Sequence, residues 1–205
     1  MRTRILRQTD YRRMRWNNGG GWTTELARFP EASDSAFDWR ISIAEIESDG
    51  AFSTFPDCDR YIALLEGVGM HLRFDAAEPA ELRERLRFVH FAGEWHTHGQ
   101  LLSGPVRDFN VIVRRGAVRA DVLHRPLVGP MVFFAEAGVS WFIYVAGGTA
   151  AIKNRSDAAA LGAGDSLLLD GGGGAENLVL TGGGELVLVK LLRADAAAAT
   201  PAAAP

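Results

Sequence analysis

Two arginines on neighbouring predicted strands are the residues whose type and position favour chemistry. In the run 39–46, WRISIAEI, bulky residues alternate with Arg40 and Ser42, which therefore share the other face of a strand. Arg60 opens a second apolar run after the turn signals of residues 48–57. A guanidinium offers a planar fork of donors that matches a carboxylate. Because an unpaired buried guanidinium is costly, each arginine either binds an anion or pairs within the barrel with Asp108, Glu25 or Glu45.

A glycine-rich segment, WNNGGGW at 16–22, adds an aromatic and an amide side chain. Trp16 and Asn18 are the groups that would stack on and hydrogen-bond a small planar or amide-bearing ligand. The three glycines resemble a phosphate-binding loop, but no Lys-Ser or Lys-Thr pair follows them and no parallel βαβ pattern surrounds them. We interpret the segment as a turn before a strand.

Metal and nucleophile chemistry have weaker support. His96 and His98 form the only His-x-His pair, but no acidic residue follows at ligand spacing, so they stay an alternative metal site. Cys58 would be a nucleophile only with a lowered thiol pKa, and a lone cysteine is more often a packing group. No Gly-x-Ser-x-Gly elbow is present. We therefore predict no catalytic residue and no cofactor, and we favour binding over catalysis.

Composition limits the partners and the compartment. A net charge of -3, with no basic stripe interleaved with aromatics, argues against nucleic acid. The single cysteine cannot form an internal disulfide, which favours a reducing cytoplasm. The N-terminus continues as Arg7-Gln8-Thr9-Asp10 without the apolar core of a signal peptide, and no run has transmembrane length. We expect no membrane partner.

The elements that must position these side chains are short strands separated by Gly and Pro turns, with almost no helical periodicity. The run 141–148 repeats the theme of 61–68, and 161–169 repeats that of 89–96. This duplication predicts an all-β fold of two antiparallel jelly-roll or β-barrel halves, and the second half could share strands with the first. The predicted parts are an N-terminal barrel with the pocket (1–118), a C-terminal barrel (119–193) and a disordered tail (194–205).

Five blocks in the first half carry a family resemblance. In their order, WNNGGGWTTELAR, WRISIAEI, FSTFPDCDR, LLEGVG and DFNVIVRR resemble the HutD/Ves family of the cupin superfamily. The blocks lie within residues 11–115, and the second half resembles the family only in its cupin-like turns, such as GAGDSLLL. Ile112 stands where the family pattern has methionine. The polar residues that match the family blocks are Trp16, Asn18, Thr24, Glu25, Arg40, Ser42, Arg60, Asp108 and Asn110.

The resemblance implies a bicupin without an established reaction that influences histidine utilisation by binding a pathway metabolite. Many cupins hold a metal with histidines placed before the turn that corresponds to Leu65-Glu66-Gly67, and here FPDCDR stands at that place with no histidine. Arg60 would repel a divalent cation there and suits a carboxylate instead. We predict a cytoplasmic sensor or regulator that binds a carboxylate such as urocanate or N-formylglutamate.

The predicted ligand pocket lies inside the N-terminal barrel. Arg40 and Arg60 would clamp the carboxylate, Trp16 would form an apolar wall, and Asp108 would orient an arginine or accept an imidazole N–H. The remaining ligand-binding residues of this hypothesis are Asn18, Thr24, Ser42 and Asn110.

The sequence leaves open two alternative functions and the formation of a homodimer. A cupin-fold enzyme would act on a histidine-pathway intermediate. An interaction module would present exposed aromatics, for which Trp95 and Trp141 are the candidates. Uncovered edge strands tend to pair, which leaves an edge-to-edge homodimer open.

Overall fold

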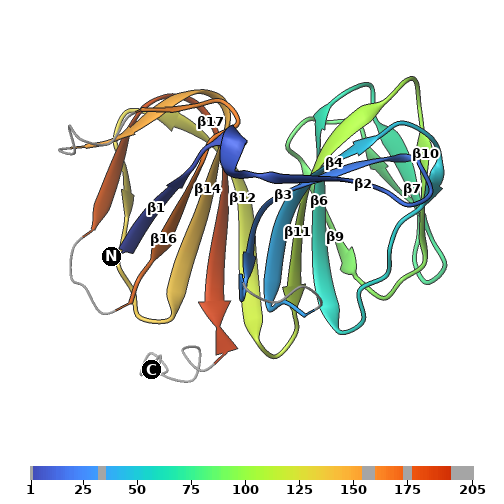
Figure 1. Cartoon of the computed structure of the whole chain (residues 1–205), viewed down its shortest axis with the longest axis horizontal. Helices are drawn as coiled ribbons and strands as arrows, with labels where there is room; N and C mark the ends of the chain where they lie inside the picture. The colour runs from blue at the N-terminus through green and yellow to red at the C-terminus, as the bar shows by residue number, and fades with distance from the viewer. Residues whose placement is uncertain (1, 32–35, 154–159, 173–176, 195–205) are drawn as a thin grey trace, which may run out of the picture. The chain divides into compact units, whose positions relative to one another are not determined.

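The computed structural model describes residues 2–31, 36–153, 160–172 and 177–194. The chain forms two compact units: the first unit is Tyr11–Arg115, and the second unit combines Met1–Asp10 with Gly116–Pro205. The named elements of the described residues are antiparallel strands and one 3-10 turn, η1 (Gln8–Asp10) (Figure 1). The predicted all-β, antiparallel fold class is confirmed, while the description of the two units as cupin barrels stays a prediction.

The first unit contains two sheets. In the six-stranded sheet, ordered β2-β3-β4-β11-β6-β9, the strands are β2 (Arg12–Arg15), β3 (Gly21–Phe29), β4 (Trp39–Ile46), β11 (Val106–Arg114), β6 (Cys58–Glu66) and β9 (Phe88–Ala92). In the four-stranded sheet, ordered β5-β10-β7-β8, they are β5 (Gly50–Ala51), β10 (Thr97–Leu101), β7 (Met70–Phe74) and β8 (Ala80–Leu82). Buried residues of both sheets meet in one apolar cluster, which includes Ile46, Leu64, Met70 and Leu82.

Period-2 alternation places the predicted polar side chains on one face of the six-stranded sheet. The register aligns Ser42 of β4 with Asn110 of β11. Two residues further along β11, Ile112 lies between Arg40 of β4 and Arg60 of β6. Side chains of paired residues project from the same side of a sheet. Three central strands therefore bring the two arginines, the serine and the asparagine together.

The turn predicted after β6 depends on glycine. Gly67 and Gly69 have φ of 103° and 122°, in the region that residues with a Cβ rarely adopt. A Cβ on Gly69 would also collide with the backbone carbonyl oxygen of Leu82 on β8. The positive φ expected of these glycines is present, but the predicted hairpin is wrong, because β6 and β7 do not pair with each other: the turn leads the chain from the six-stranded sheet to β7 of the other sheet.

The second unit contains one seven-stranded sheet. Its main order is β1-β16-β14-β17-β12, while β13 pairs with β17 and β15 with β14. The strands are β1 (Arg2–Leu6), β12 (Val118–Val128), β13 (Met131–Phe133), β14 (Val139–Ile152), β15 (Leu161–Gly162), β16 (Ser166–Asp170) and β17 (Leu178–Arg193). Its apolar cluster is rich in leucine, including Leu167, Leu169 and Leu188.

Three predictions about the chain's organisation have different outcomes. Strand β1 pairs with β16 and its Ile5 packs on the apolar cluster of the second unit, so it differs from the predicted grouping of 1–118. Residues 195–205 of the predicted tail lie outside the described residues. Trp95 and Trp141 are each partly buried against an apolar cluster, so neither is a fully exposed aromatic. Within the described ranges, no helix is long and apolar enough to cross a membrane.

Candidate functional site

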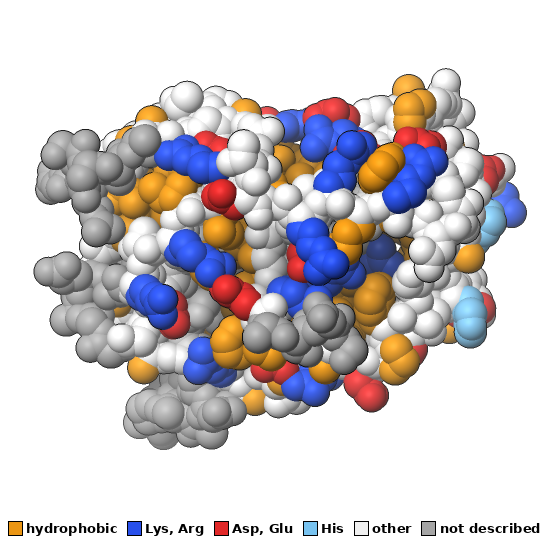
Figure 2. Space-filling model, in the orientation of Figure 1, with side chains coloured by type: hydrophobic (Ala, Val, Ile, Leu, Met, Phe, Trp, Pro, Cys, Tyr) orange, Lys and Arg blue, Asp and Glu red, His pale blue; other side chains and the backbone are white. Residues whose placement is uncertain are grey.

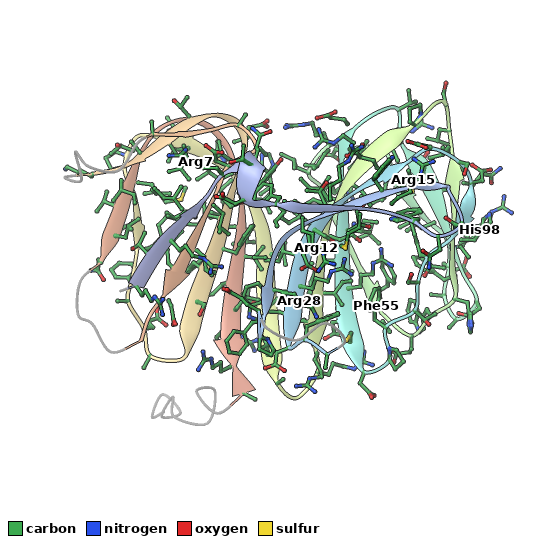
Figure 3. All side chains as sticks on the ribbon, in the orientation of Figure 1. Arg7, Arg12, Arg15, Arg28, Phe55 and His98 are labelled. Atoms are coloured by element: carbon green, nitrogen blue, oxygen red, sulfur yellow. The ribbon has the colours of Figure 1, made fainter. Side chains whose placement is uncertain are left out.

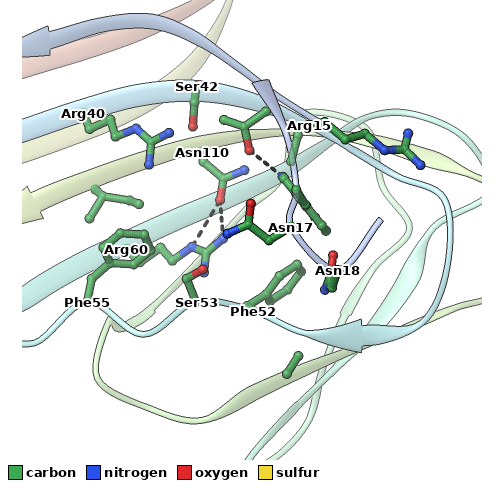
Figure 4. Close-up of a pocket in the computed structure, with 15 residues that line it drawn as sticks. Arg15, Asn17, Asn18, Arg40, Ser42, Phe52, Ser53, Phe55, Arg60 and Asn110 are labelled. Atoms are coloured by element: carbon green, nitrogen blue, oxygen red, sulfur yellow. Dashed lines mark hydrogen bonds between the residues drawn. The ribbon is translucent and has the colours of Figure 1, made fainter. Parts of the chain in front are cut away.

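A cavity of about 430 Å³ opens in the first unit, over the face that carries the two arginines (Figure 4). Its floor comes from β4, β6 and β11, and its walls come from the segments 15–18 and 51–55. The volume is within the range of small-molecule pockets. The lining residues are Arg15, Trp16, Asn17, Asn18, Thr23, Arg40, Ser42, Ala44, Ala51, Phe52, Ser53, Phe55, Arg60, Asn110 and Ile112.

Arg60 is the buried charge of this cavity, with 7% of its surface exposed. Its Nε and Nη2 donate to Oδ1 of Asn110 at 3.1 and 2.7 Å (Figure 4). The guanidinium also lies 4.8 Å from the ring centroid of Phe52 and 5.8 Å from that of Phe55. Among the described residues, no carboxylate is within ion-pair distance of it. Arg60 is therefore held by a neutral amide and aromatic rings, without a direct anionic partner.

Asn110 connects Arg60 to a carboxyl group behind the cavity. Its Nδ2 donates to Oδ1 of Asp108, two residues earlier on β11. A guanidinium has donors only, so the amide oxygen must face Arg60 and the amide nitrogen must face an acceptor. Asp108 is fully buried, with 0% exposed, and it does not line the cavity. The carboxyl group thus acts on the cavity through Asn110 and Arg60.

Arg40 is partly paired inside the chain. Its Nε donates to Oε2 of Glu25 on β3 at 2.7 Å, and Nη1 of Arg28 lies 3.7 Å from the same oxygen. The side chains of Arg40 and Glu25 are 18% and 13% exposed. The ion pair within the fold that the sequence left open is therefore present for Arg40, while Arg40 still lines the cavity with Arg60 (Figure 4).

Trp16 forms the apolar wall that the sequence predicted. Its Nε1 donates to Oγ1 of Thr23 at 2.7 Å, which fixes the indole plane at the cavity edge. Gly21 permits this position, because a Cβ there would lie 3.2 Å from the indole ring and would collide with the backbone carbonyl of Glu45. Asn18 is engaged in the same turn, accepting from the backbone N–H of Gly20 at 3.0 Å.

The charges around the cavity leave it electropositive. Burial is the largest influence on Arg60 and lowers its pKa to about 10, with Asp108 opposing and Arg40 adding to the decrease, so the guanidinium stays protonated at neutral pH. Burial raises the pKa of Asp108 to about 7, against the opposing effects of Arg60 and the Asn110 hydrogen bond. At neutral pH, Asp108 therefore compensates Arg60 only in part. An anion at the cavity floor would complete the compensation.

Six of the eight predicted ligand-binding residues line this cavity: Trp16, Asn18, Arg40, Ser42, Arg60 and Asn110. Thr24 does not, because it pairs with Ile43 and projects from the opposite face of β3, while Thr23 pairs with Ala44 and faces the cavity. Asp108 lies behind the cavity as described above. Whether these residues bind a ligand stays a prediction.

Sequence reasoning missed the other aromatic side chains that line the cavity. Phe52, Ser53 and Phe55 line the cavity, and Phe52 and Phe55 lie near the Arg60 guanidinium. Their segment, AFSTFP, lies among turn signals and has no strand periodicity, so alternation assigns its side chains to no face. A signal was nevertheless present, because two phenylalanines in a polar turn need an apolar neighbour.

The alternative metal and nucleophile residues lie outside the cavity. His96 is exposed and its Nδ1 lies 2.9 Å from Oδ2 of Asp75. His98 projects from the edge of the first unit, away from Phe55 (Figure 3). In the described part of the chain, no three His, Cys, Asp or Glu residues are grouped to hold a metal ion. Cys58 is buried, and burial raises its thiol pKa, which disfavours the reactive thiolate.

Basic side chains on the surface lie beside acidic ones. On the face drawn in Figure 2, Lys and Arg side chains alternate with Asp and Glu side chains. In the first unit, Arg13 pairs with Glu45 at 2.7 Å, and Arg15, which lines the edge of the cavity, pairs with Glu47 at 3.1 Å. Both guanidinium groups also lie over the Trp22 ring. The cavity therefore differs from these surface sites in having a buried arginine without a paired carboxylate.

Comparisons with known proteins place this site in a family context. A family model described as HutD matches residues 8–188. A 21.2 kDa protein of Pseudomonas putida, named for the hutC 3′ region, is 43% identical over 116 residues, which are 57% of this chain and 60% of that protein. The matched stretch thus spans less than two thirds of that relative's length.

Two solved structures are similar over nearly the whole chain. HutD from Pseudomonas fluorescens SBW25 is 31% identical with a TM-score of 0.80, covering 94% of this chain and 99% of that one. A conserved protein of unknown function from Pseudomonas aeruginosa PAO1 is 34% identical with a TM-score of 0.79, covering 94% and 98%.

Proposed function

The chain belongs to the HutD family, and from that premise we propose that it binds a small carboxylate in the cavity of the first unit and thereby senses or regulates histidine utilisation. The observation that carries the proposal is Arg60, a buried guanidinium that faces a cavity of about 430 Å³ and bonds a neutral amide. Desolvating a charge is costly, and an incoming anion would offset that cost.

The rest of the cavity suits an elongated acid with a planar or polar body. Ser42 and Arg40 lie on the floor beside Arg60, where they add donors for the carboxylate. Trp16, Phe52 and Phe55 supply apolar walls for the body of the ligand. Asn17 and Asn18 at the edge add amide groups for a second polar end. Urocanate and N-formylglutamate both have this build.

The pathway assignment draws on the family and on the relative named for the hutC 3′ region. We place the protein in the cytoplasm, where such acids would be intermediates of catabolism. We further infer a bicupin in which the first unit binds the ligand. The second unit has a core filled with leucine and other large apolar side chains, which favours a structural role for it.

Binding can be measured by isothermal titration of the purified protein with N-formylglutamate, urocanate and histidine. We expect one of the acids to bind saturably. Arg60→Met should weaken its affinity by about 10- to 100-fold, because hydrogen bonds to a charged group contribute about 1.5–3 kcal/mol. A ligand that binds only the folded state should also raise the unfolding temperature.

Arg87→Met is the matched control. Arg87 belongs to the same unit, but its side chain is 75% exposed and pairs with Glu84 away from the cavity. Its substitution should leave affinity unchanged. The proposal fails if none of the three compounds binds, or if Arg60→Met binds as tightly as the wild type.

A further inference from the structure

Asp108 occupies a boundary between the cavity floor and the apolar core of the first unit. It lies on the same face of β11 as Asn110 and Ile112, both of which line the cavity. Its own register partners are Ala44 on β4 and Leu64 on β6, which belong to the apolar cluster. A carboxyl group here is surrounded by apolar side chains on one side and by the asparagine and arginine of the site on the other.

The bonding of this carboxyl group is incomplete. Oδ1 accepts from Asn110, while the buried Oδ2 has no hydrogen-bond partner among the described residues. A purely structural acceptor for Asn110 would need only one oxygen, which an asparagine side chain at position 108 also provides. The second oxygen and the negative charge are therefore unexplained by the hydrogen bond alone.

The charged groups that face Asp108 from the packed elements are few. From β6 comes Arg60, whose charge lowers the pKa of Asp108, while burial raises it to about 7. From β4 comes Arg40, which acts on Arg60 and is paired with Glu25 of β3. The members of β7 and β8 in the adjoining cluster are apolar. Arg60 is thus the charge to which Asp108 responds.

We propose, on the basis of the carboxylate site argued above, that Asp108 is its positioning residue: it holds Asn110 so that Arg60 faces the cavity, and it takes up a proton when an anion binds there. The bound anion offsets part of the positive charge of Arg60, which otherwise stabilises the Asp108 carboxylate. With this stabilisation reduced and apolar side chains around it, Asp108 becomes easier to protonate.

The sign of the pH dependence follows from this linkage. Anion binding raises the pKa of Asp108, so the complex holds more protons than the free protein near neutral pH. Affinity therefore increases as pH falls through the pKa of Asp108 and levels off once the free protein is also protonated. One coupled proton limits the change to about tenfold per pH unit.

The test is isothermal titration of the full chain with N-formylglutamate between about pH 6 and about pH 8.5, a range in which its carboxylates stay ionised. Parallel runs in buffers of different ionisation enthalpy report the protons taken up. The wild type should bind more weakly at the upper pH, with fractional proton uptake near neutrality. Equal affinity and zero proton uptake across the range would overturn the proposal.

Two variants separate positioning from proton uptake. Asp108→Asn keeps an acceptor for Asn110 and should bind at all pH values in this range, with neither proton uptake nor pH-dependent affinity. Asp108→Leu removes the acceptor, frees Asn110 to rotate, and should weaken binding about tenfold or more even at the lower pH. A retained slope in Asp108→Asn, or unchanged affinity in Asp108→Leu, would contradict the respective role.

A measurement without the pathway acid keeps this inference distinct from the proposed function. Carboxyl-carbon NMR of the free protein should show a titration midpoint of Asp108 near neutral pH. The midpoint should be higher than this in Arg60→Met, and also higher than this in the wild type with saturating formate as a simple carboxylate probe. If N-formylglutamate does not bind but formate raises the midpoint, the ligand assignment fails and the Asp108 inference stands. A midpoint in the ordinary Asp range, near 4, would refute the inference.

Discussion

Replacing Arg40 by methionine should reduce mainly the stability of the protein, whereas replacing Arg60 by methionine should reduce mainly its ligand affinity. Arg40→Met removes the 2.7 Å partner of Glu25 and leaves that 13% exposed carboxylate with Arg28, at 3.7 Å, as its remaining ion-pair partner among the described residues. Breaking a fully buried pair costs about 3–5 kcal/mol, whereas exposed pairs are worth about 0–1 kcal/mol. With side chains 18% and 13% exposed, we place the loss at about 1–3 kcal/mol.

Arg60→Met should change the stability of the ligand-free protein by less, within about 1 kcal/mol. The substitution breaks two bonds to Asn110 but also removes a buried charge that has no ion-pair partner among the described residues. Methionine refills part of the space against Phe52 and Phe55, and water in the cavity can bond the Asn110 oxygen. Ligand affinity, in contrast, should fall further in Arg60→Met than in Arg40→Met.

Urea unfolding followed by tryptophan fluorescence would measure these losses in the unit concerned. Four of the five tryptophans lie in the first unit, and a Trp141→Phe background removes the fifth. The double variant Glu25→Gln/Arg40→Met is the control, because it leaves no unpaired carboxylate and should recover part of the loss. Arg40→Met unfolding at the wild-type urea midpoint, or Arg60→Met proving the less stable of the two, would refute this account of the cavity charges.

Two further measurements test the buried titratable groups. Folding raises the pKa of Asp108 from 3.8 to about 7, so between these values the folded state holds a proton that the unfolded state has lost. The stability of the wild type should therefore fall relative to that of Asp108→Asn as pH rises from about 4 to about 7, and the difference should stay level above pH 7. Urea midpoints of the two proteins that run parallel over this range would contradict the prediction. Cys58, buried and with a raised thiol pKa, should react with a thiol reagent only as the first unit opens, and labelling of the native protein at the rate of a free thiol would contradict its packing role.

Local alternation was sufficient to predict part of the site. On β4, the run WRISIAEI shows Arg40 and Ser42 on one face, and both line the cavity. On β3, alternation says only that Thr23 and Thr24 face opposite sides. Which one faces inward is decided by the pairing of Thr23 with Ala44, a contact that lies far away in sequence.

Other features depend on contacts that a single strand does not encode. The pattern of residues 2–6 indicates a strand, but its partner β16 is more than a hundred residues away. Asp108 and Asn110 are equivalent polar positions on one face of β11, yet Asn110 lies in the cavity floor and Asp108 lies behind it. Burial along a strand depends on what the facing sheet places over it, here the apolar cluster shared with β7 and β8.

The chain from Asp108 through Asn110 to Arg60 is hard to explain by stability. Replacing buried ionic groups with well-packed apolar side chains is often neutral or stabilising. These three hydrogen-bonded side chains place a charge, an amide and a carboxyl group with one unbonded oxygen on a face whose neighbouring positions hold Ala44, Leu64 and Ile112. Such an arrangement is consistent with selection for an anion whose binding satisfies Arg60 and changes the charge of Asp108. The buried polar chain is therefore better understood as a component of a binding site than as a support of the fold.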